Sequence, residues 1–404
     1  MEVSGSTIGI FYISKFLGLA PFSTRSNIKG KLDISRSLLF STYSAALILI
    51  MVCLTYRGLL FDANSKIPVR MKSATSKVVT ALDVSVVVMA TVAGVFCGIL
   101  GVTSSRNLNK RLQKIDDWLH SFANVKKDRI LAVIVVLLPM SSISILLGLD
   151  VWTWLRFVEE ISIDNEDADL NVQWYIPFYS LYFILTGLHI SFANTAFGLG
   201  RRYRRLNLML RSSCIGEGKP NFVIFYFDSE PSSLYFCVFA ARKQSVVIRH
   251  LAEHHASLGK CVTIVSSSYG IAVLFILVSC LLHLVATAYF LFLEILSKKD
   301  SGYLWLQILW IIFHVFRLLL VVEPCHLATN ESRKSIQIIC EIERKNHDPI
   351  LAEEIKKFWQ QLLVSDSEFT AMGLCKVNRK ILTSFSSAIA TYLVILIQFQ
   401  KTNG

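Results

Sequence analysis

Small and polar side chains form one face of the last apolar stretch of the chain, residues 381–400. Steps of four, three, four and three residues return to the same side of an α-helix. At those steps the face carries Ser384, Ala388, Thr391, Ile395 and Gln398. An amide in hydrocarbon is costly unless it meets water or a polar partner. The stripe therefore suits a helix that lines a water-filled ion pathway, and it equally suits helix–helix packing through small residues.

A second set of polar and aromatic residues is spread over the other apolar stretches. Asp83 places a carboxylate inside one stretch, and Gln307, Trp310 and His314 recur at steps of three and four on one face of another. Aromatic rings pack on the C–H faces of a sugar, while carboxylate, amide and imidazole groups hydrogen-bond its hydroxyls. The candidate ligand-binding residues are Asp83, Asp150, Trp154, Tyr179, Tyr182, Thr287, Tyr289, Gln307, Trp310 and His314.

Each of these residues also has a purely structural interpretation. Trp and Tyr near the ends of a membrane span form the aromatic belt of many membrane proteins. His314 lies deep enough to be a hydrogen-bonded core histidine, as do His189 and His283. Asp83 could pair with a neighbouring hydroxyl. A carboxylate inside a span nevertheless indicates a functional site by default, so Asp83 is the sharpest candidate.

Membrane helices are the elements that must position these residues. Hydrophobic residues make up 53% of the 404 residues and charged residues only 17%, a composition typical of membrane proteins. Several stretches are long enough to cross about 30 Å of hydrocarbon. The sequence predicts an all-α membrane protein with seven transmembrane helices near residues 38–56, 78–101, 130–149, 174–199, 267–296, 304–323 and 381–400.

The distribution of Lys and Arg predicts the orientation of these spans. Thirty-one of the 41 Lys and Arg residues lie in the N-terminal segment and in alternate connections on the same side, and Arg317 lies inside a span. Because such residues favour the cytosolic side, the N-terminus is expected in the cytosol and the C-terminus outside the cell. This topology is inverted relative to G-protein-coupled receptors, so it argues against that class.

Several other classes of protein are not supported by the sequence. The net charge of +12 is mostly the positive-inside excess, so we expect no nucleic-acid partner. We find no glycine-rich phosphate loop, zinc-type cysteine pairing or nucleophile elbow, and we expect neither an enzyme nor a cofactor or metal. The last span carries one stripe rather than the interrupted helix pairs of many secondary transporters.

The regions between the spans suggest a simple organisation. Residues 1–37 form a cytosolic N-terminal segment, 38–323 a ligand-binding bundle of six spans, 324–380 a cytosolic helical anchor, and 381–404 the seventh, pore-lining helix. Between 348 and 366 apolar residues recur at helical spacing, which predicts an amphipathic helix that either packs with other helices or lies on the bilayer. Its mixed charges favour packing. Residues of about 212–245 are interpreted as a variable cytosolic insert, because Asp228, Glu230 and Pro231 would interrupt any span there.

The C-terminal sequence also resembles a known family. The string TYLVILIQF, from Thr391 to Phe399, resembles the end of the last helix in insect gustatory receptors, and residues 373–379 (GLCKVNR) and 383–385 (TSF) resemble its entry. Residues 60–92, 171–200 and 270–296 are similar to the fructose-receptor lineage of that family. The likeness covers most of the chain and departs from it at about 212–245.

The resemblance implies the insect chemoreceptor ion-channel fold and a specific function. It implies a homotetramer that meets mainly through the cytosolic helices, with other gustatory receptor subunits as further candidate partners. Each copy would line the pore with Thr391, Ile395, Gln398 and Phe399. We expect a non-selective channel for Na, K and Ca ions, gated by fructose and surrounded by lipids in the plasma membrane of sensory or nutrient-sensing neurons. The alternatives are the same channel gated by a bitter compound or odorant, or a membrane transporter.

Overall fold

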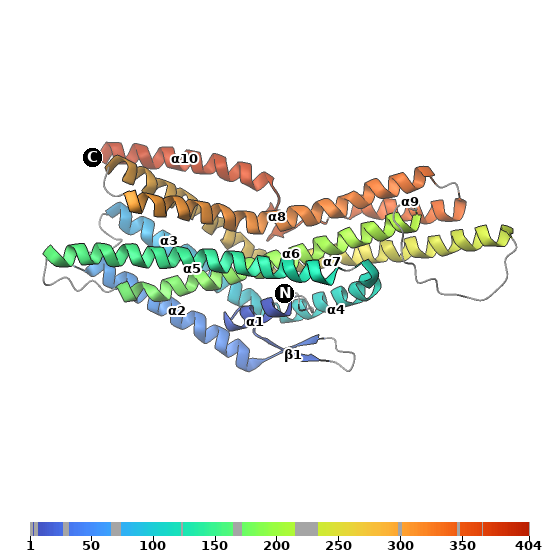
Figure 1. The fold of residues 1–404 in the computed structure, drawn as a ribbon, viewed down its shortest axis with the longest axis horizontal. Helices are drawn as coiled ribbons and strands as arrows, with labels where there is room; N and C mark the ends of the chain where they lie inside the picture. Colours follow the sequence, from blue (N-terminus) through green and yellow to red (C-terminus); the bar gives the residue numbers. More distant parts are fainter. Residues whose placement is uncertain are drawn as a thin grey trace.

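Long helices lie side by side along the longest axis of the molecule (Figure 1). The structure is a computed structural model, and it describes residues 3, 7–26, 32–65, 74–122, 124–164, 172–214, 233–297, 301–345, 348–365 and 367–403. Within these residues, six helices are long and apolar enough to cross a membrane, and a seventh is apolar over Lys380–Ile395. The seven are α2 (Leu38–Asn64), α3 (Ala74–Leu100), α5 (Val125–Asp164), α6 (Ile176–Cys214), α7 (Ser233–Ser297), α8 (Ser301–Lys345) and α10 (Lys380–Asn403). Every predicted span therefore falls on a helix.

The shorter elements lie between these helices or before them. They are α1 (Ile8–Phe16), β1 (Phe22–Ser26), β2 (Leu32–Arg36), α4 (Val102–Leu119), η1 (His120–Phe122), η2 (Val172–Tyr175), α9 (Pro349–Val364), β3 (Thr370–Ala371) and β4 (Cys375–Lys376). The strands form two antiparallel hairpins, β1–β2 and β3–β4. The sequence had suggested neither hairpin. The β1–β2 hairpin buries Phe22 and Ile34 against Phe11 of α1.

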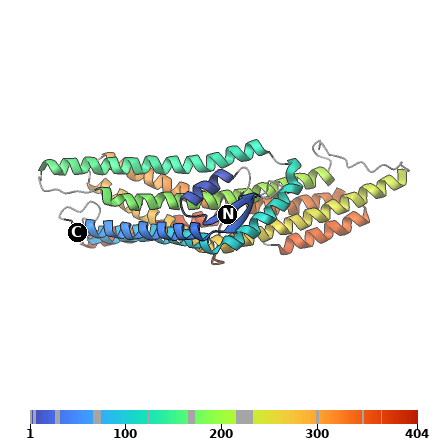
Figure 2. The same cartoon turned by 90° about the horizontal axis from the view of Figure 1, so that it is seen from below.

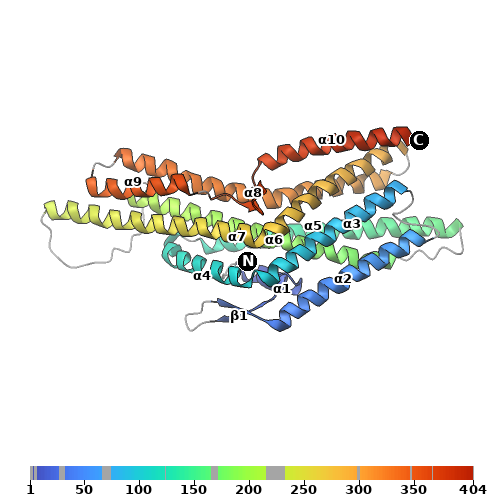
Figure 3. The same ribbon diagram turned by 180° about the vertical axis from the view of Figure 1, so that it is seen from behind.

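Several helices continue well past the membrane. The 65 residues of α7 span roughly 100 Å at the rise of an α-helix, about three times the thickness of the hydrocarbon. The predicted spans 267–296 and 304–323 are thus the outer parts of α7 and α8. The elongated shape is also visible from below and from behind (Figures 2 and 3). Of the predicted insert at 212–245, residues 215–232 lie outside the described residues, and α7 already begins at Ser233.

The amphipathic segment near residue 350 forms α9 and packs inside the chain. The side chain of Asp348 caps the helix by accepting a hydrogen bond from the Ile350 backbone N–H at 2.9 Å. The apolar face, which includes Leu351, Ile355 and Phe358, is buried against α7 and α8. This face therefore packs on helices of its own chain rather than on the bilayer surface.

Phe358 offers a direct test of this packing. It is 1% exposed and meets the ring of His255 edge-on at 5.8 Å. We expect Phe358→Ala to destabilise the cytosolic helices by about 3 kcal/mol, because it leaves a cavity in a close-packed interior. The control is Val364→Ala at the end of the same helix, where the side chain is 87% exposed. Thermal unfolding in detergent should show a lower midpoint for the first variant only; equal midpoints would contradict the assignment.

The β3–β4 hairpin joins α9 to α10 and rests on α7. Its turn places Met372 and Gly373 at positive φ, at 54° and 73°. The backbone of this turn approaches Gly270 of α7 so closely that a Cβ there would lie 3.0 Å from the Met372 nitrogen. Such an approach favours glycine, since a larger side chain would push the hairpin away. The entry to α10 is therefore fitted tightly to α7.

Candidate functional site

Asp83 of α3 faces His283 of α7 inside the outer half of the helical bundle. One Asp83 carboxylate oxygen lies 3.1 Å from His283 Nε2, and the two side chains are 21% and 2% exposed. The Tyr182 hydroxyl of α6 lies 2.9 Å from the same ring nitrogen. Three helices that are distant in sequence thus bring a carboxylate, an imidazole and a phenol together.

The hydrogen bonds of His283 determine what this group can do. Its Nδ1 faces the Ser279 backbone carbonyl, which can only accept, so Nδ1 carries a hydrogen. In the neutral ring Nε2 then accepts a hydrogen bond from Tyr182; in the protonated ring Nε2 donates and pairs with the Asp83 charge. The carboxylate, the ring and the phenol therefore form one unit whose hydrogen bonds reverse with a single proton.

Arg317 of α8 adds a buried guanidinium to the same cluster. It is 1% exposed; its Nη1 lies 3.2 Å from His314 Nδ1, and its Nη2 donates to Ser279 Oγ at 3.3 Å. Among the described residues, its Nε–H has no hydrogen-bond partner. A buried donor without a partner costs free energy, so this N–H would gain from an acceptor brought by a ligand.

Aromatic rings enclose one side of this cluster. The Trp310 ring stacks on His314 with centroids 5.4 Å apart, and the His314 and His283 rings are 4.6 Å apart. Tyr182 lies 5.5 Å from Trp310. Gln307, one turn before Trp310 on α8, is 8% exposed. The predicted face of α8 thus points into the bundle. His283 of α7 lies between this face and Asp83 of α3.

Asp150 and Tyr179 form a second polar pair between α5 and α6. The Tyr179 hydroxyl donates a hydrogen bond to the carboxylate of Asp150, a residue that is 5% exposed. Trp154 follows one turn later on α5 and is partly buried against the core. This pair is linked to the first cluster along α6, because Tyr179 and Tyr182 lie three residues apart and both pack on Phe178.

The remaining two candidates on α7 occupy different positions. Thr287 lies one turn beyond His283 and donates its hydroxyl to the His283 carbonyl at 2.7 Å. Tyr289 is buried beside Phe290, and its spacing of six residues places it on another face of α7 than His283. Thr287 therefore borders the cluster, whereas Tyr289 points elsewhere.

Two members of the cluster were not among the candidates from the sequence. His283 was assigned to the core, and Arg317 entered only the charge count. A signal for Arg317 was nevertheless present, because a charged residue within a span indicates a functional site by default. It also lies three residues after His314, on the same helical face. His283 also lies within a span, but its partners come from α3 and α6, so its sequence neighbours do not show what it contacts.

The polar stripe of α10 is exposed on the single chain. Ser384, Thr391, Ile395 and Gln398 are exposed and Ala388 is half-buried, while α10 packs mainly against α7. The Thr391 hydroxyl donates to the Ser387 carbonyl on its own helix. The predicted pore residue Phe399 has no described side chain. Most of this stripe is therefore exposed on the single chain, where it can meet water or other copies.

The base of α10 is tied to α8 by a two-pronged ion pair. The Arg379 guanidinium contacts the two Glu323 carboxylate oxygens at 2.8 and 2.9 Å. Nearby, Glu368 pairs with Arg333 of α8 and with Lys376, and the Lys376 ammonium lowers the pKa of Glu368 from its ordinary value. The cytosolic entry to α10 is therefore held by charges on α8 as well as by packing on α7.

We expect the Arg379–Glu323 pair to affect the resting position of α10. Glu323→Gln should change the current measured in the absence of ligand by about twofold. The effect is small because an exposed ion pair contributes little free energy. The charge reversal, Glu323→Arg with Arg379→Glu, should restore the parent current. A reversal that behaves like the single variant would show that the contact has no role.

Comparison with known proteins places this arrangement in context. The family profile described as "7tm Chemosensory receptor" matches residues 9–403. The gustatory receptor for sugar taste 43a of Drosophila melanogaster is 61% identical, and the match covers all of both chains. The gustatory and pheromone receptor 32a of the same fly is 34% identical over 23% of this chain and 20% of its own length.

Solved structures are also similar over nearly the full length. The insect olfactory receptor OR5 of Machilis hrabei matches with a TM-score of 0.65 and 14% identity, covering 97% of both chains. Its complex with eugenol matches with a TM-score of 0.61, 13% identity and the same coverage. At such low identity the likeness concerns the fold alone. It confirms the predicted insect chemoreceptor fold.

Proposed function

Because this chain belongs to the 7tm chemosensory receptors, and within them to the insect gustatory receptors, we propose that it is a taste receptor that works as a sugar-gated cation channel in the plasma membrane. Fructose is the proposed ligand. Four copies assemble around one pore, and each contributes α10. Nutrient sensing inside the body is a second setting for the same response.

One observation carries the proposal: α7 and α8 contribute residues to the polar cluster, and the same two helices contact α10 or its base. His283 belongs to α7, which supports α10 and the hairpin before it. His314 and Arg317 belong to α8, which grips the base of α10 through Glu323. A ligand that shifts α7 relative to α8 would therefore move α10 without further intermediates.

The cluster has the chemistry that a small sugar requires. Asp83 offers a second carboxylate oxygen that has no hydrogen-bond partner among the described residues, and Arg317 offers its Nε–H. Hydroxyl groups can donate to the first and accept from the second. Trp310 and Tyr182 provide apolar ring faces for the C–H groups.

The ligand opens the channel if it binds the open state more tightly than the closed state. The cluster is nearly closed, since most of its side chains are buried. A sugar must separate the outer ends of the helices to enter, so it binds the separated state better and shifts the population towards it. In the pore, Ile395 would exclude water in the closed state, and movement of Gln398 towards the axis would wet the pathway.

Whole-cell recording from cells that express this chain alone tests the proposal. Fructose, glucose and sucrose are applied in turn, with surface expression measured on the same cells. We expect an inward cation current to fructose only. Saturable sugar uptake without unitary currents would indicate a transporter. A current to bitter compounds or odorants and none to sugars would leave the channel but refute the ligand.

A further inference from the structure

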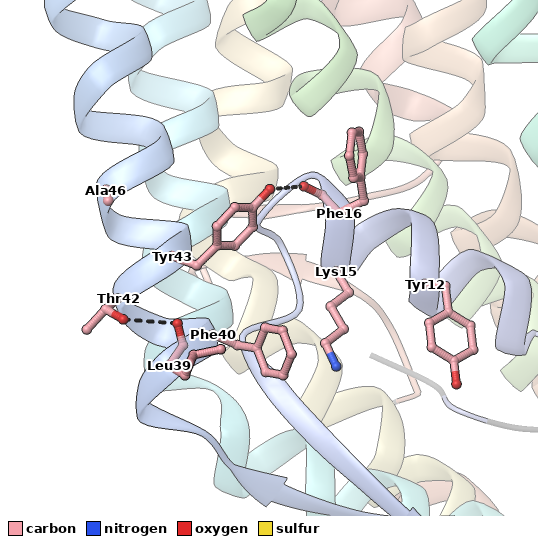
Figure 4. A pocket seen from close by; sticks show the side chains of 8 residues that line it. All are labelled: Tyr12, Lys15, Phe16, Leu39, Phe40, Thr42, Tyr43 and Ala46. Atoms are coloured by element: carbon pink, nitrogen blue, oxygen red, sulfur yellow. Dashed lines mark hydrogen bonds between the residues drawn. The ribbon is translucent and has the colours of Figure 1, made fainter.

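An open groove of about 680 Å³ lies between α1 and the start of α2 (Figure 4). Its lining is almost entirely apolar and aromatic, with Phe16 of α1 and Leu39 of α2 on its two sides. Its one charged lining residue is Lys15. The groove is distant in sequence from the polar cluster and is not needed for the proposed gating.

The groove lies at the inner boundary of the hydrocarbon. The apolar part of α2 begins at Leu38, and the N-terminal segment, with three Lys and two Arg residues, precedes it on the cytosolic side. Leu38, Leu39 and Phe16 are 75%, 70% and 76% exposed. Such large apolar side chains side by side are expected to face lipid rather than water.

Helix α1 has the pattern of a helix that lies in the membrane interface. Ile8, Tyr12 and Phe16 recur at steps of four and are exposed, whereas Phe11 is buried on the other face. Ser14, also buried, shares a 2.7 Å hydrogen bond with Ser191 of α6. The Tyr43 hydroxyl of α2 donates to the Phe16 carbonyl at 2.7 Å (Figure 4). The groove is therefore a fixed feature rather than a gap between loose segments.

Lys15 supplies a positive charge that no acid in the described chain pairs with. Its ammonium lies 3.5 Å from the centre of the Phe40 ring, a cation–π contact. Burial lowers the pKa of Lys15 from its ordinary value, and burial is the only cause of that shift. The acid on the adjacent hairpin, Asp33, is held by Arg106 at 3.0 Å. An anion from outside the chain would complete this site.

We propose that this groove binds an anionic glycerophospholipid of the inner leaflet. Its phosphate lies against Lys15, and an acyl chain follows Phe16 and Leu39 into the hydrocarbon. The inner leaflet supplies the anionic headgroups that the charge selects. A second copy of the chain is a poorer occupant, because in Figures 1 and 3 α1 and the start of α2 lie on the edge of the bundle opposite α10.

Photolabelling of the full-length protein in phosphatidylcholine vesicles tests the site. Phosphatidylserine or phosphatidylcholine with a diazirine in the acyl chain is added in trace amount, and the labelled peptides are mapped. We expect labelling of residues 8–16 and 38–46, with the serine lipid preferred by about fivefold at one lysine. Lys15→Gln should remove the preference, while the control Lys110→Gln, an exposed lysine on α4, should keep it.

A second variant distinguishes a loss of labelling at the groove from a loss of labelling caused by misfolding. Ala46→Trp places a bulky ring in the groove and should reduce labelling there by both lipids, while labelling elsewhere on α2 continues. Equal labelling by the two lipids, or a preference that persists in Lys15→Gln, would overturn the proposal in favour of ordinary boundary lipid. An unlabelled groove on a labelled α2 would show that protein covers it and would overturn the proposal too.

Discussion

Replacing Asp83 with asparagine should raise the fructose concentration for half-maximal current by at least about tenfold, with no change in single-channel conductance. A hydrogen bond to a charged group contributes about 1.5–3 kcal/mol, and every 1.4 kcal/mol is a factor of ten in affinity. The neutral amide also removes the charge that pairs with the protonated His283 ring. Both losses fall on ligand binding, because Asp83 is on α3 and the conducting path is assigned to α10.

A matched carboxylate outside the cluster separates this effect from a general loss of charge. Asp33→Asn on the β1–β2 hairpin removes an acid that forms an ion pair with Arg106 at the surface, outside the cluster. Its dose–response curve should coincide with that of the parent. If Asp83→Asn also coincides with the parent at equal surface expression, the cluster does not bind sugar.

Replacing Gln398 should change ion permeation and leave sugar affinity unaltered. In a tetramer, four Gln398 amides would face one another across the pore, so Gln398→Ala would remove a ring of polar groups and Gln398→Glu would add a ring of charges. We expect the alanine variant to lower conductance and the glutamate variant to raise the permeability to calcium relative to sodium, because rings of carboxylates select cations. The half-maximal fructose concentration should stay within about twofold.

Reversal potentials in mixed sodium and calcium solutions measure this change. Ser386→Ala is the control, because Ser386 lies on the opposite side of α10 from the stripe and donates its hydroxyl to Leu382 of its own helix. Unaltered reversal potentials and conductance in both Gln398 variants would place the conducting path elsewhere.

Composition and spacing were enough to predict which segments form the long helices. The spans and the amphipathic helix α9 follow from apolar periodicity, which acts within one segment at a time. Asp83 and the α8 face with Trp310 and His314 were found for the same reason, since each is a local departure from an apolar pattern. The stripe of α10 was also local, and its exposure in one chain agrees with either a pore or a subunit interface.

Contacts between distant segments could not be predicted in this way. The approach of His283 to Asp83 joins helices about two hundred residues apart and depends on how α3, α6 and α7 cross. The β3–β4 hairpin is too short to show a strand pattern, and its turn is set by the tight fit against Gly270. The groove beside Lys15 exists only because α1 folds back against the start of α2.

The exposed stripe of α10 also has a consequence for biosynthesis. A newly inserted chain that has not yet met its partners exposes small and polar residues of α10 such as Ser384 and Thr391, a kind of stripe that packs well against other membrane helices. In the proposed tetramer this stripe would be covered or would face water, so its exposure would mark a chain that is not yet assembled. Retention of such chains in the endoplasmic reticulum would limit the number of receptors at the cell surface by the rate at which subunits meet rather than by the rate at which they are made.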